Sequence, residues 1–150
     1  MTHHGQNRDQ AQRRQHFRVL VAKDDELRIR IWQLGQRLEV IPDPPRDAHN
    51  ATALNISAGG LLLSLAAVPF PFKITDIVGL ALERGQDLNR LQAQIRYIAK
   101  APPKPAKMGM QFLFDAASAT DRRSQRQVER MIAEMQRDQL KRLSNYRMGP

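Results

Sequence analysis

Two arginines near the N-terminus, Arg14 and Arg18, have the spacing of a pair that grips one anion. Four residues are about one helical turn and also two strand repeats, so both guanidinium groups lie on one side of either structure. A guanidinium presents a planar fork of donors that matches phosphate oxygens and the O6/N7 edge of guanine. The pair therefore favours an anionic guanine nucleotide as ligand. For this motif taken alone, a basic run on a solvated arm is the alternative.

Three neighbours of this pair extend the motif. Arg13 would help to neutralise a second anionic nucleotide if two bind as a stacked pair. His16 lies inside the arginine pair, where it would touch the ligand. Phe17 would anchor this segment to the folded body. Arg13 and His16 each also have an ordinary interpretation as solvated surface residues.

A second polar motif occupies residues 55–60, between two apolar runs. In an extended strand, Asn55 and Ser57 share one face while Leu54 and Ile56 share the other. We therefore expect the polar pair to point outward and the apolar pair to enter the core.

Gly59 and Gly60 follow this polar pair and permit a sharp bend. Because they lack a Cβ atom, they also let a ligand approach the backbone and use its amides. The segment lacks the lysine of a P-loop, so it does not predict a triphosphate site. A hairpin turn built from small residues is the alternative for this motif by itself.

The elements that position these motifs are short strands, indicated by alternating apolar and polar residues. Gly35, Gly85–Asp87 and the proline-rich stretch after Ala101 mark connections. Residues 36–50, which contain three prolines, are interpreted as an extended hairpin without a functional account. Strands are predicted over residues 27–33, 38–41, 51–56, 60–65, 77–84, 88–100 and 107–114.

Residues 118–144 contain no Gly or Pro and are rich in good helix formers, so they predict a long helix. Ser118 or Thr120 would cap its start, and Asp121 would complement the helix dipole there. Met108, Met110, Phe112 and Phe114 have strand spacing and are assigned to the core, and Trp32 is assigned to packing. An apolar stripe for packing on the barrel comprises Val128, Met131, Ile132, Met135, Leu140 and Leu143.

Strands followed by one helix predict a mainly β fold, a small antiparallel six- or seven-stranded β-barrel with a C-terminal α-helix. We expect a flexible basic N-terminal arm at residues 1–15, the barrel at 16–117, and the helix with a frayed tail at 118–150. The arm is polar and almost without apolar residues.

Composition bounds the function. The 150 residues carry a formal charge of +9, which predicts attraction to an anionic partner, and the absence of cysteine excludes disulfides and thiolate metal sites. No apolar run is long enough to cross a membrane, and we expect a cytoplasmic protein without membrane insertion.

No nucleophile has a suitable base, so no enzyme is predicted. The histidines lack the spacing of metal ligands, so no metal site is predicted: they are His3, His4, His16 and His49.

Together, the two motifs resemble the paired signature of the PilZ domain, RxxxR followed by [D/N]xSxxG. Arg14 and Arg18 match the first part, and Asn55, Ser57 and Gly60 match the second. Both occur in the family's order, with a basic arm, a run of short strands and a closing helix around them. The basic helix is also similar to that of flagellar brake-type PilZ proteins.

PilZ domains are bacterial receptors for cyclic di-GMP, so the resemblance implies a cyclic di-GMP receptor that changes conformation and signals to a protein partner. Motility or surface-polysaccharide control are the outputs it suggests. It implies that Arg14 and Arg18 clamp the ligand and that Asn55, Ser57 and Gly60 hold it on the barrel. Asn55 stands where Asp is commonest, which removes the charge-assisted part of one hydrogen bond.

Two other classes of function remain open. The charge of +9 is compatible with a general nucleic-acid-binding barrel, although no RNA-binding motif or basic recognition helix supports it and no DNA or RNA partner is expected. The terminal helix is compatible with an oligomeric scaffold, and the sequence leaves monomer and dimer undecided. The expected ligand is cyclic di-GMP, without any cofactor.

Overall fold

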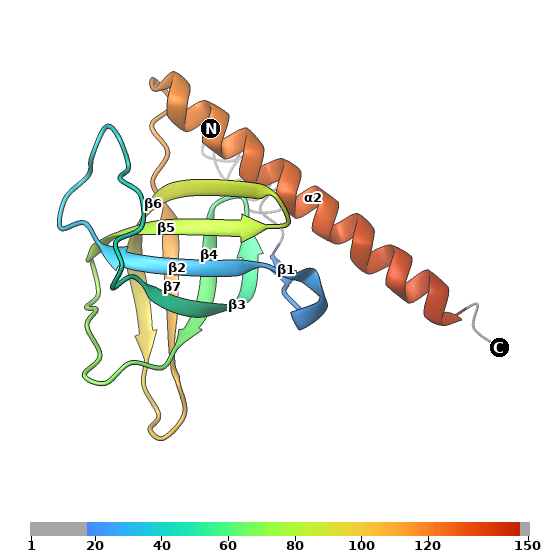
Figure 1. Ribbon diagram of the computed structural model, residues 1–150, viewed down its shortest axis with the longest axis horizontal. Helices are drawn as coiled ribbons and strands as arrows, with labels where there is room; N and C mark the ends of the chain where they lie inside the picture. The colour runs from blue at the N-terminus through green and yellow to red at the C-terminus, as the bar shows by residue number, and fades with distance from the viewer. Residues whose placement is uncertain (1–17, 148–150) are drawn as a thin grey trace, which may run out of the picture.

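The computed structural model describes residues 18–147, which form seven strands, a short 3-10 helix and one long α-helix (Figure 1). This order agrees with the mainly β fold predicted from the sequence. The elements are β1 (Val19–Leu20), η1 (Lys23–Asp25), β2 (Arg28–Gln33), β3 (His49–Ser57), β4 (Gly60–Leu65), β5 (Ile77–Arg84), β6 (Asp87–Ala99), β7 (Ala106–Phe112) and α2 (Ala119–Arg147).

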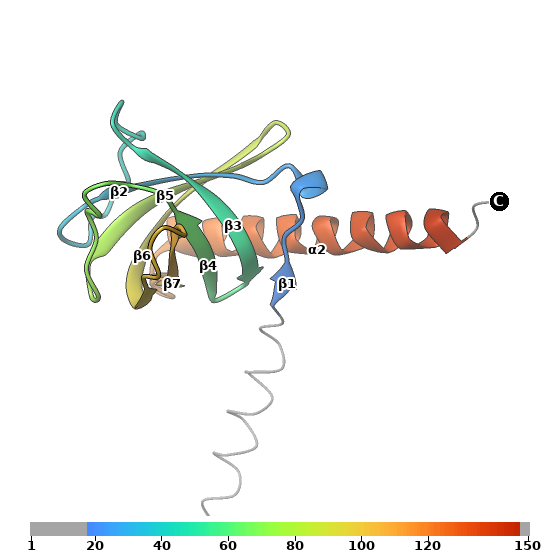
Figure 2. The ribbon, with the colours of Figure 1, turned by 90° about the horizontal axis from the view of Figure 1, so that it is seen from below.

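Six of the strands close into an antiparallel barrel (Figures 1 and 2). The hydrogen-bonded order runs β3-β2-β5-β6-β7-β4, and β4 pairs back to β3, so the ring has no open edge. The seventh strand, β1, pairs with the end of β3, where Leu20 lies opposite Asn55. Closure removes the unpaired backbone edges that would otherwise invite aggregation.

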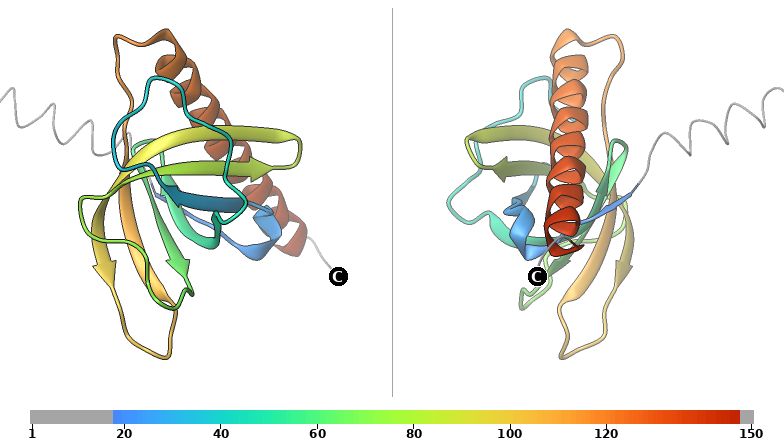
Figure 3. Two further views of the ribbon diagram at one scale, coloured as in Figure 1. Left: turned by 60° about the vertical axis from the view of Figure 1, so that its left-hand side comes forward. Right: turned by 90° about the vertical axis from the view of Figure 1, so that its right-hand side faces the viewer.

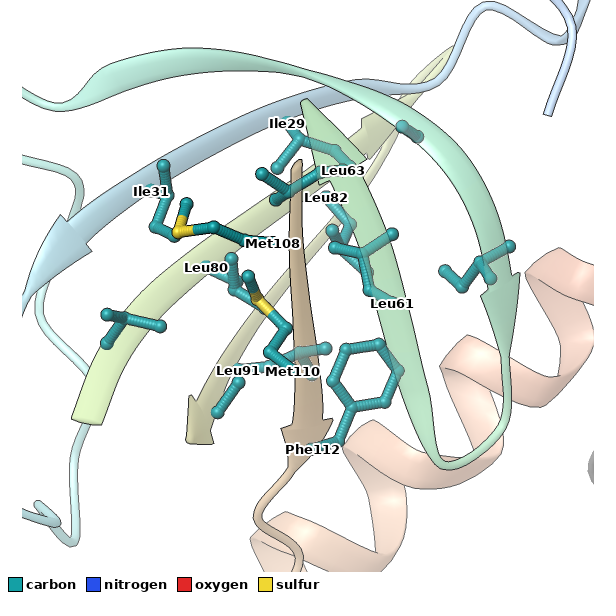
Figure 4. Close-up of a cluster of buried hydrophobic side chains, with 14 of the residues drawn as sticks. Ile29, Ile31, Leu61, Leu63, Leu80, Leu82, Leu91, Met108, Met110 and Phe112 are labelled. Carbon is teal, nitrogen blue, oxygen red and sulfur yellow. The ribbon is translucent and has the colours of Figure 1, made fainter. Parts of the chain in front are cut away.

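Alternate residues of these strands fill the barrel interior, as the period-two pattern predicts (Figure 4). Met108, Met110 and Phe112 of β7 are buried there, whereas Phe114, after the strand, is partly buried. Trp32 is buried as predicted, and a Cβ atom at Gly79 would lie 2.4 Å from its ring. A glycine at this position of β5 therefore makes room for the indole.

The strand predicted over residues 38–41 is wrong, because residues 34–48 form an irregular connection. Both edges of β2 are already occupied, one by β3 and the other by β5, so a return strand has no partner. The connection is fixed instead by the buried Gln92 side chain, whose Nε2 donates to Leu38 O and whose Oε1 accepts from Leu38 N, both at 2.6 Å. A side-chain amide here replaces the backbone ladder of a hairpin.

The long helix begins as predicted, because Ser118 Oγ accepts a hydrogen bond from Asp121 N at 3.2 Å. Figure 3 shows α2 lying along one side of the barrel, and Figure 2 shows its last turns extending past the strands. The first four predicted stripe residues are buried there, but Leu140 and Leu143 are exposed, Leu140 by 65%. Leu140 follows Met135 by five positions, so its side chain points about 140° away from that of Met135 around the helix axis. Spacing of three and four ends at Met135, so the predicted stripe is too long.

The end of α2 is held by polar contacts to η1 in place of apolar ones. Asp25 is 0% exposed, and its carboxylate accepts from Arg142 Nη2 (2.6 Å), Gln139 Nε2 (2.9 Å) and Ala22 N (2.7 Å). Gln139 Nε2 also donates to Leu20 O at 2.8 Å. Burial by itself raises the pKa of the Asp25 carboxyl, but the hydrogen bonds from Arg142, Ala22 and Gln139 together bring the pKa below its usual value.

Candidate functional site

A surface depression of about 440 Å³ lies beside the β3–β4 turn and contains most of the described residues of the two sequence motifs. Arg18 forms one part of its wall, and Ser57, Gly59 and Gly60 form another. The remaining lining residues come from β4, β6 and β7: Leu61, Leu62, Arg96, Tyr97, Gly109, Met110 and Gln111.

The pairing of β1 with β3 brings Arg18 to this turn. Val19 lies opposite Ile56 and Leu20 opposite Asn55, so the antiparallel register carries Arg18 toward Ser57. Two segments almost forty residues apart therefore meet at one edge. Arg18 is exposed at this edge.

Of the other predicted ligand residues, only Asn55 is among those that the structure describes. Arg13, Arg14 and His16 fall outside the described residues, as does Phe17. Asn55 is half-buried on β3 and does not line the depression. The roles of these residues remain predictions.

A bulge between Ala53 and Asn55 breaks the simple alternation predicted for the end of β3. Leu54 consequently is only half-buried, whereas Ile56 is fully buried and Ser57, predicted to point outward, is buried too. The Ser57 hydroxyl accepts from Gly59 N at 3.3 Å and donates weakly to Gly60 O at 3.5 Å. Ser57 thus fixes the shape of the turn that a ligand would meet.

A steric constraint that the sequence did not reveal explains why position 60 is a glycine. A Cβ atom there would lie 2.4 Å from the carbonyl oxygen of Met110, which is far inside contact distance. Gly60 pairs with Gln111 of β7, and Phe112 N donates to Gly59 O at 2.9 Å. Glycine is required at position 60 because β4 and β7 approach closely. The close approach also holds the β3–β4 turn against β7.

Arg96 and Tyr97 of β6 are site residues that the motifs did not indicate. Tyr97 is 52% exposed and follows a register shift between Ile95 and Tyr97. Arg96 Nη2 donates to Gln111 Oε1 at 2.9 Å, which holds its positive charge over β7. An alternating arginine and tyrosine on a strand is too common a pattern to signal a site. Pairing of β6 with β7, and of β7 with β4, brings them to the turn.

Gly109 lies between Leu62 and Tyr97 in the lining of the depression. A Cβ atom at Gly109 would lie 3.3 Å from Tyr97 Cβ and 3.9 Å from Leu62 Cδ1, so Gly109 separates the two side chains. An exposed aromatic ring beside a glycine backbone offers a flat surface on which a planar base can stack. Arg18 and Arg96 supply positive charge at its rim, which suits a ligand with both a base and a phosphate.

A larger depression, of about 1100 Å³, lies where η1 and β2 meet β3. Its rim carries Lys23 and Arg28 but also Glu26 and Glu83, so its charges largely cancel. The smaller depression has arginines without any lining carboxylate. The charges of its lining residues, more than its volume, therefore make the smaller depression the candidate anion site.

Within residues 18–147, no cluster of three histidine, cysteine or acidic side chains has the arrangement of a metal site. The described helices include none that is long and apolar enough to cross a bilayer.

Comparison with known proteins agrees with this fold. The model of the PilZ domain matches residues 12–134. Among solved structures, the PilZ domain of YcgR from Escherichia coli with c-di-GMP has a TM-score of 0.62 at 18% identity, covering 88% of this chain and 98% of that one. At this identity the likeness concerns the fold.

Two longer proteins also match. The Bacillus subtilis inhibitor of motility, MotI/DgrA, has a TM-score of 0.54 at 20% identity, covering 82% of this chain and 51% of that one. E. coli YcgR in complex with c-di-GMP has a TM-score of 0.56 at 18% identity, covering 89% of this chain and 50% of that one. This chain spans about half the length of each. No curated protein matches it significantly. Since the family model covers most of the chain, including both sequence motifs, the protein belongs to the PilZ domain family.

Proposed function

We propose that this protein is a non-enzymatic receptor that binds cyclic di-GMP over the depression beside the β3–β4 turn and passes the signal to a protein partner. The observation that carries the proposal is that β1 brings Arg18, the second arginine of RxxxR, to the Ser57–Gly60 turn. Arg18 belongs to the first half of the PilZ signature, and Ser57 and Gly60 belong to the second. They are distant in the sequence and lie in one depression.

The lining of this depression suits the dinucleotide. Arg18 and Arg96 provide guanidinium groups for the phosphates or for the O6/N7 edge of guanine, and Tyr97 provides a face for base stacking. The E. coli YcgR PilZ domain, which has a similar fold, was solved with c-di-GMP. We assign Arg14 as the second clamp residue, with Asn55, Ser57 and Gly60 as the platform. Arg13, His16 and Gly59 are assigned secondary contacts.

Binding then works as a switch. Arg14 and Arg18 close on the ligand against the β3–β4 turn, and the closed form presents a new surface in the bacterial cytoplasm to a partner that controls motility or polysaccharide output. The ligand shifts this equilibrium through its higher affinity for the closed arrangement, in which both arginines contact it.

The test is calorimetric titration of the protein with cyclic di-GMP and, separately, with GMP at the same ionic strength. We expect saturable binding of the cyclic dinucleotide and much weaker binding of GMP, which provides one base and one phosphate. Equal affinity for both ligands, or heat that disappears at moderate salt for both, would indicate a general polyanion binder and contradict the proposal.

Replacing Tyr97 by alanine is expected to weaken binding of cyclic di-GMP by roughly 5- to 150-fold, the loss of one base–aromatic stack. Tyr97→Phe keeps the ring and is the matched control, which should bind like the wild type. Because Tyr97 is half exposed, neither change should alter the unfolding temperature appreciably. Equal loss in both variants would assign the effect to the hydroxyl group and remove stacking from the site.

A further inference from the structure

The two loops at the lower end of the barrel in Figure 1 are rich in basic residues, and none of their residues lines the ligand depression. They are the β4–β5 loop, residues 66–76, and the β6–β7 hairpin around residues 98–107; together we call them the loop pole. Four of the chain's six lysines lie in it, and all four are exposed: Lys73, Lys100, Lys104 and Lys107.

One acidic residue offsets only part of this positive charge. Asp76 is the one acidic residue in the sequence of these two segments. Its carboxylate accepts hydrogen bonds from Gln33 Nε2 at 2.7 Å and from Lys73 N at 2.8 Å, so it caps its own loop. The lysine ammonium groups therefore face solvent as a concentrated positive field.

Apolar side chains stand among these lysines. Val68, in the β4–β5 loop, is 100% exposed, and Ile74 is also exposed. Lys100 Nζ lies 4.6 Å from the centre of the Phe70 ring, which joins the hairpin to the β4–β5 loop. Exposed apolar side chains bordered by charged residues are a feature of surfaces that bind proteins or membranes.

The backbone of the loop pole is poor in hydrogen-bond donors. Five of the chain's nine prolines lie in it, at positions 69, 71, 102, 103 and 105, and all five are exposed. Proline has no N–H, so these positions need no donor partner when water is excluded. The loop pole thus loses less hydrogen bonding on entering an apolar medium than ordinary loops do.

We propose that the loop pole docks on the surface of an anionic lipid bilayer, with Val68 and Ile74 entering the headgroup boundary and the lysines contacting lipid phosphates. A bilayer accommodates protruding apolar tips without a preformed pocket, and its negative potential attracts clustered lysines. An acidic protein would need a cavity shaped for the tips. A nucleic-acid backbone would leave the apolar tips uncovered.

The test is co-flotation of the full chain with vesicles of phosphatidylcholine containing phosphatidylglycerol, compared with phosphatidylcholine alone. We expect binding to the anionic vesicles only. Lys100→Gln combined with Lys104→Gln should lower the partition coefficient about 30-fold, at roughly fivefold for each lysine near an anionic surface.

The matched control is Arg123→Gln combined with Arg126→Gln, which removes the same charge from exposed residues at the start of α2. The views in Figures 1 and 3 place this helix end opposite the loop pole. The control should bind vesicles like the wild type. Equal loss in both double variants would mean that overall charge drives binding, and would overturn the proposal.

Val68→Ser separates lipid from an acidic protein surface. We expect about tenfold weaker vesicle binding, because an apolar side chain no longer enters the headgroup boundary. Two results together would show that the loop pole recognises acidic chains and that the lipid proposal is wrong. They are vesicle binding by Val68→Ser equal to that of the wild type, and release of the protein from the vesicles by soluble poly-L-glutamate. Circular dichroism of each variant should match the wild type, since all changed side chains are exposed.

Discussion

Replacing Arg14 and Arg18 together by alanine is expected to weaken the binding of cyclic di-GMP by about 100-fold or more. A hydrogen bond to a charged group contributes about 1.5 to 3 kcal/mol, so each arginine accounts for roughly 10- to 150-fold in affinity. Arg18 lines the depression beside Ser57 and Gly60, where its guanidinium meets no carboxylate of the lining. Calorimetric titration of the double variant measures the loss directly.

The unfolding temperature without ligand should hardly change in this double variant, because Arg18 is exposed. Arg123→Ala with Arg126→Ala, an equal loss of charge on the exposed start of α2, should leave the affinity close to that of the wild type. Retention of full affinity in the Arg14 and Arg18 variant would remove the clamp from the proposed function. A similar loss in the α2 control would show a long-range charge effect in its place.

Replacing Asp25 by alanine is expected to destabilise the fold by about 3 kcal/mol. Removing one partner of a buried ion pair leaves other groups without their acceptor, and this typically costs several kcal/mol. Arg142, Gln139 and Ala22 N all donate to this carboxylate, and Arg142 keeps partial access to water, which moderates the loss. The unfolding temperature should fall by roughly 6 to 12 °C for a domain of this size.

Asp24→Ala is the matched control, because Asp24 is the exposed neighbour with the same charge. It should leave stability nearly unchanged. Hydrogen exchange should also quicken at the end of α2 in Asp25→Ala, where Gln139 no longer ties the helix to Asp25. Equal stability of the two variants would show that the apolar contacts of Val128 to Met135 are sufficient to hold α2.

The same carboxylate gives the protein a pH dependence. The folded state lowers the pKa of Asp25 below its ordinary value of 3.8, so the contribution of this carboxylate to the stability of the fold is fully present above about pH 4. It is lost as the pH falls through the lower, folded-state pKa. Denaturant unfolding at pH 7 and at decreasing acidic pH should therefore show the gap between wild type and Asp25→Ala narrowing below pH 4. A gap that stays constant through this range would contradict the assigned role.

Several strands and the start of the long helix were predictable from local sequence patterns. Alternation placed six of the strands, including β4 and β5, and the capping serine before a run without Gly or Pro placed the start of α2. The PilZ signature was readable because its residues keep fixed spacings along the chain. Local sequence determines these features because side-chain periodicity and capping act within a few residues.

Other features depend on which strands become neighbours. The sequence suggested a strand at residues 38–41, but β3 and β5 occupy both edges of β2. It suggested that Leu140 joins the apolar face of α2, but the face of α2 toward η1 carries Gln139 and Arg142 at this turn, and Leu140 is exposed. Gly60 was attributed to ligand access, whereas the close approach of Met110 O also requires it. In each case the deciding contact comes from a distant segment.

By itself the sequence determined the chemistry of the candidate site: an arginine pair, a polar turn with two glycines, and an alternating barrel to carry them. Only the tertiary structure decided the composition of that site. Pairing of β1 with β3 brings Arg18 to the turn, and pairing of β6 and β7 adds Arg96 and Tyr97, which no motif marks. The physical reason is that periodicity records which side of a strand is buried, whereas the choice of its neighbours depends on closure of the whole barrel.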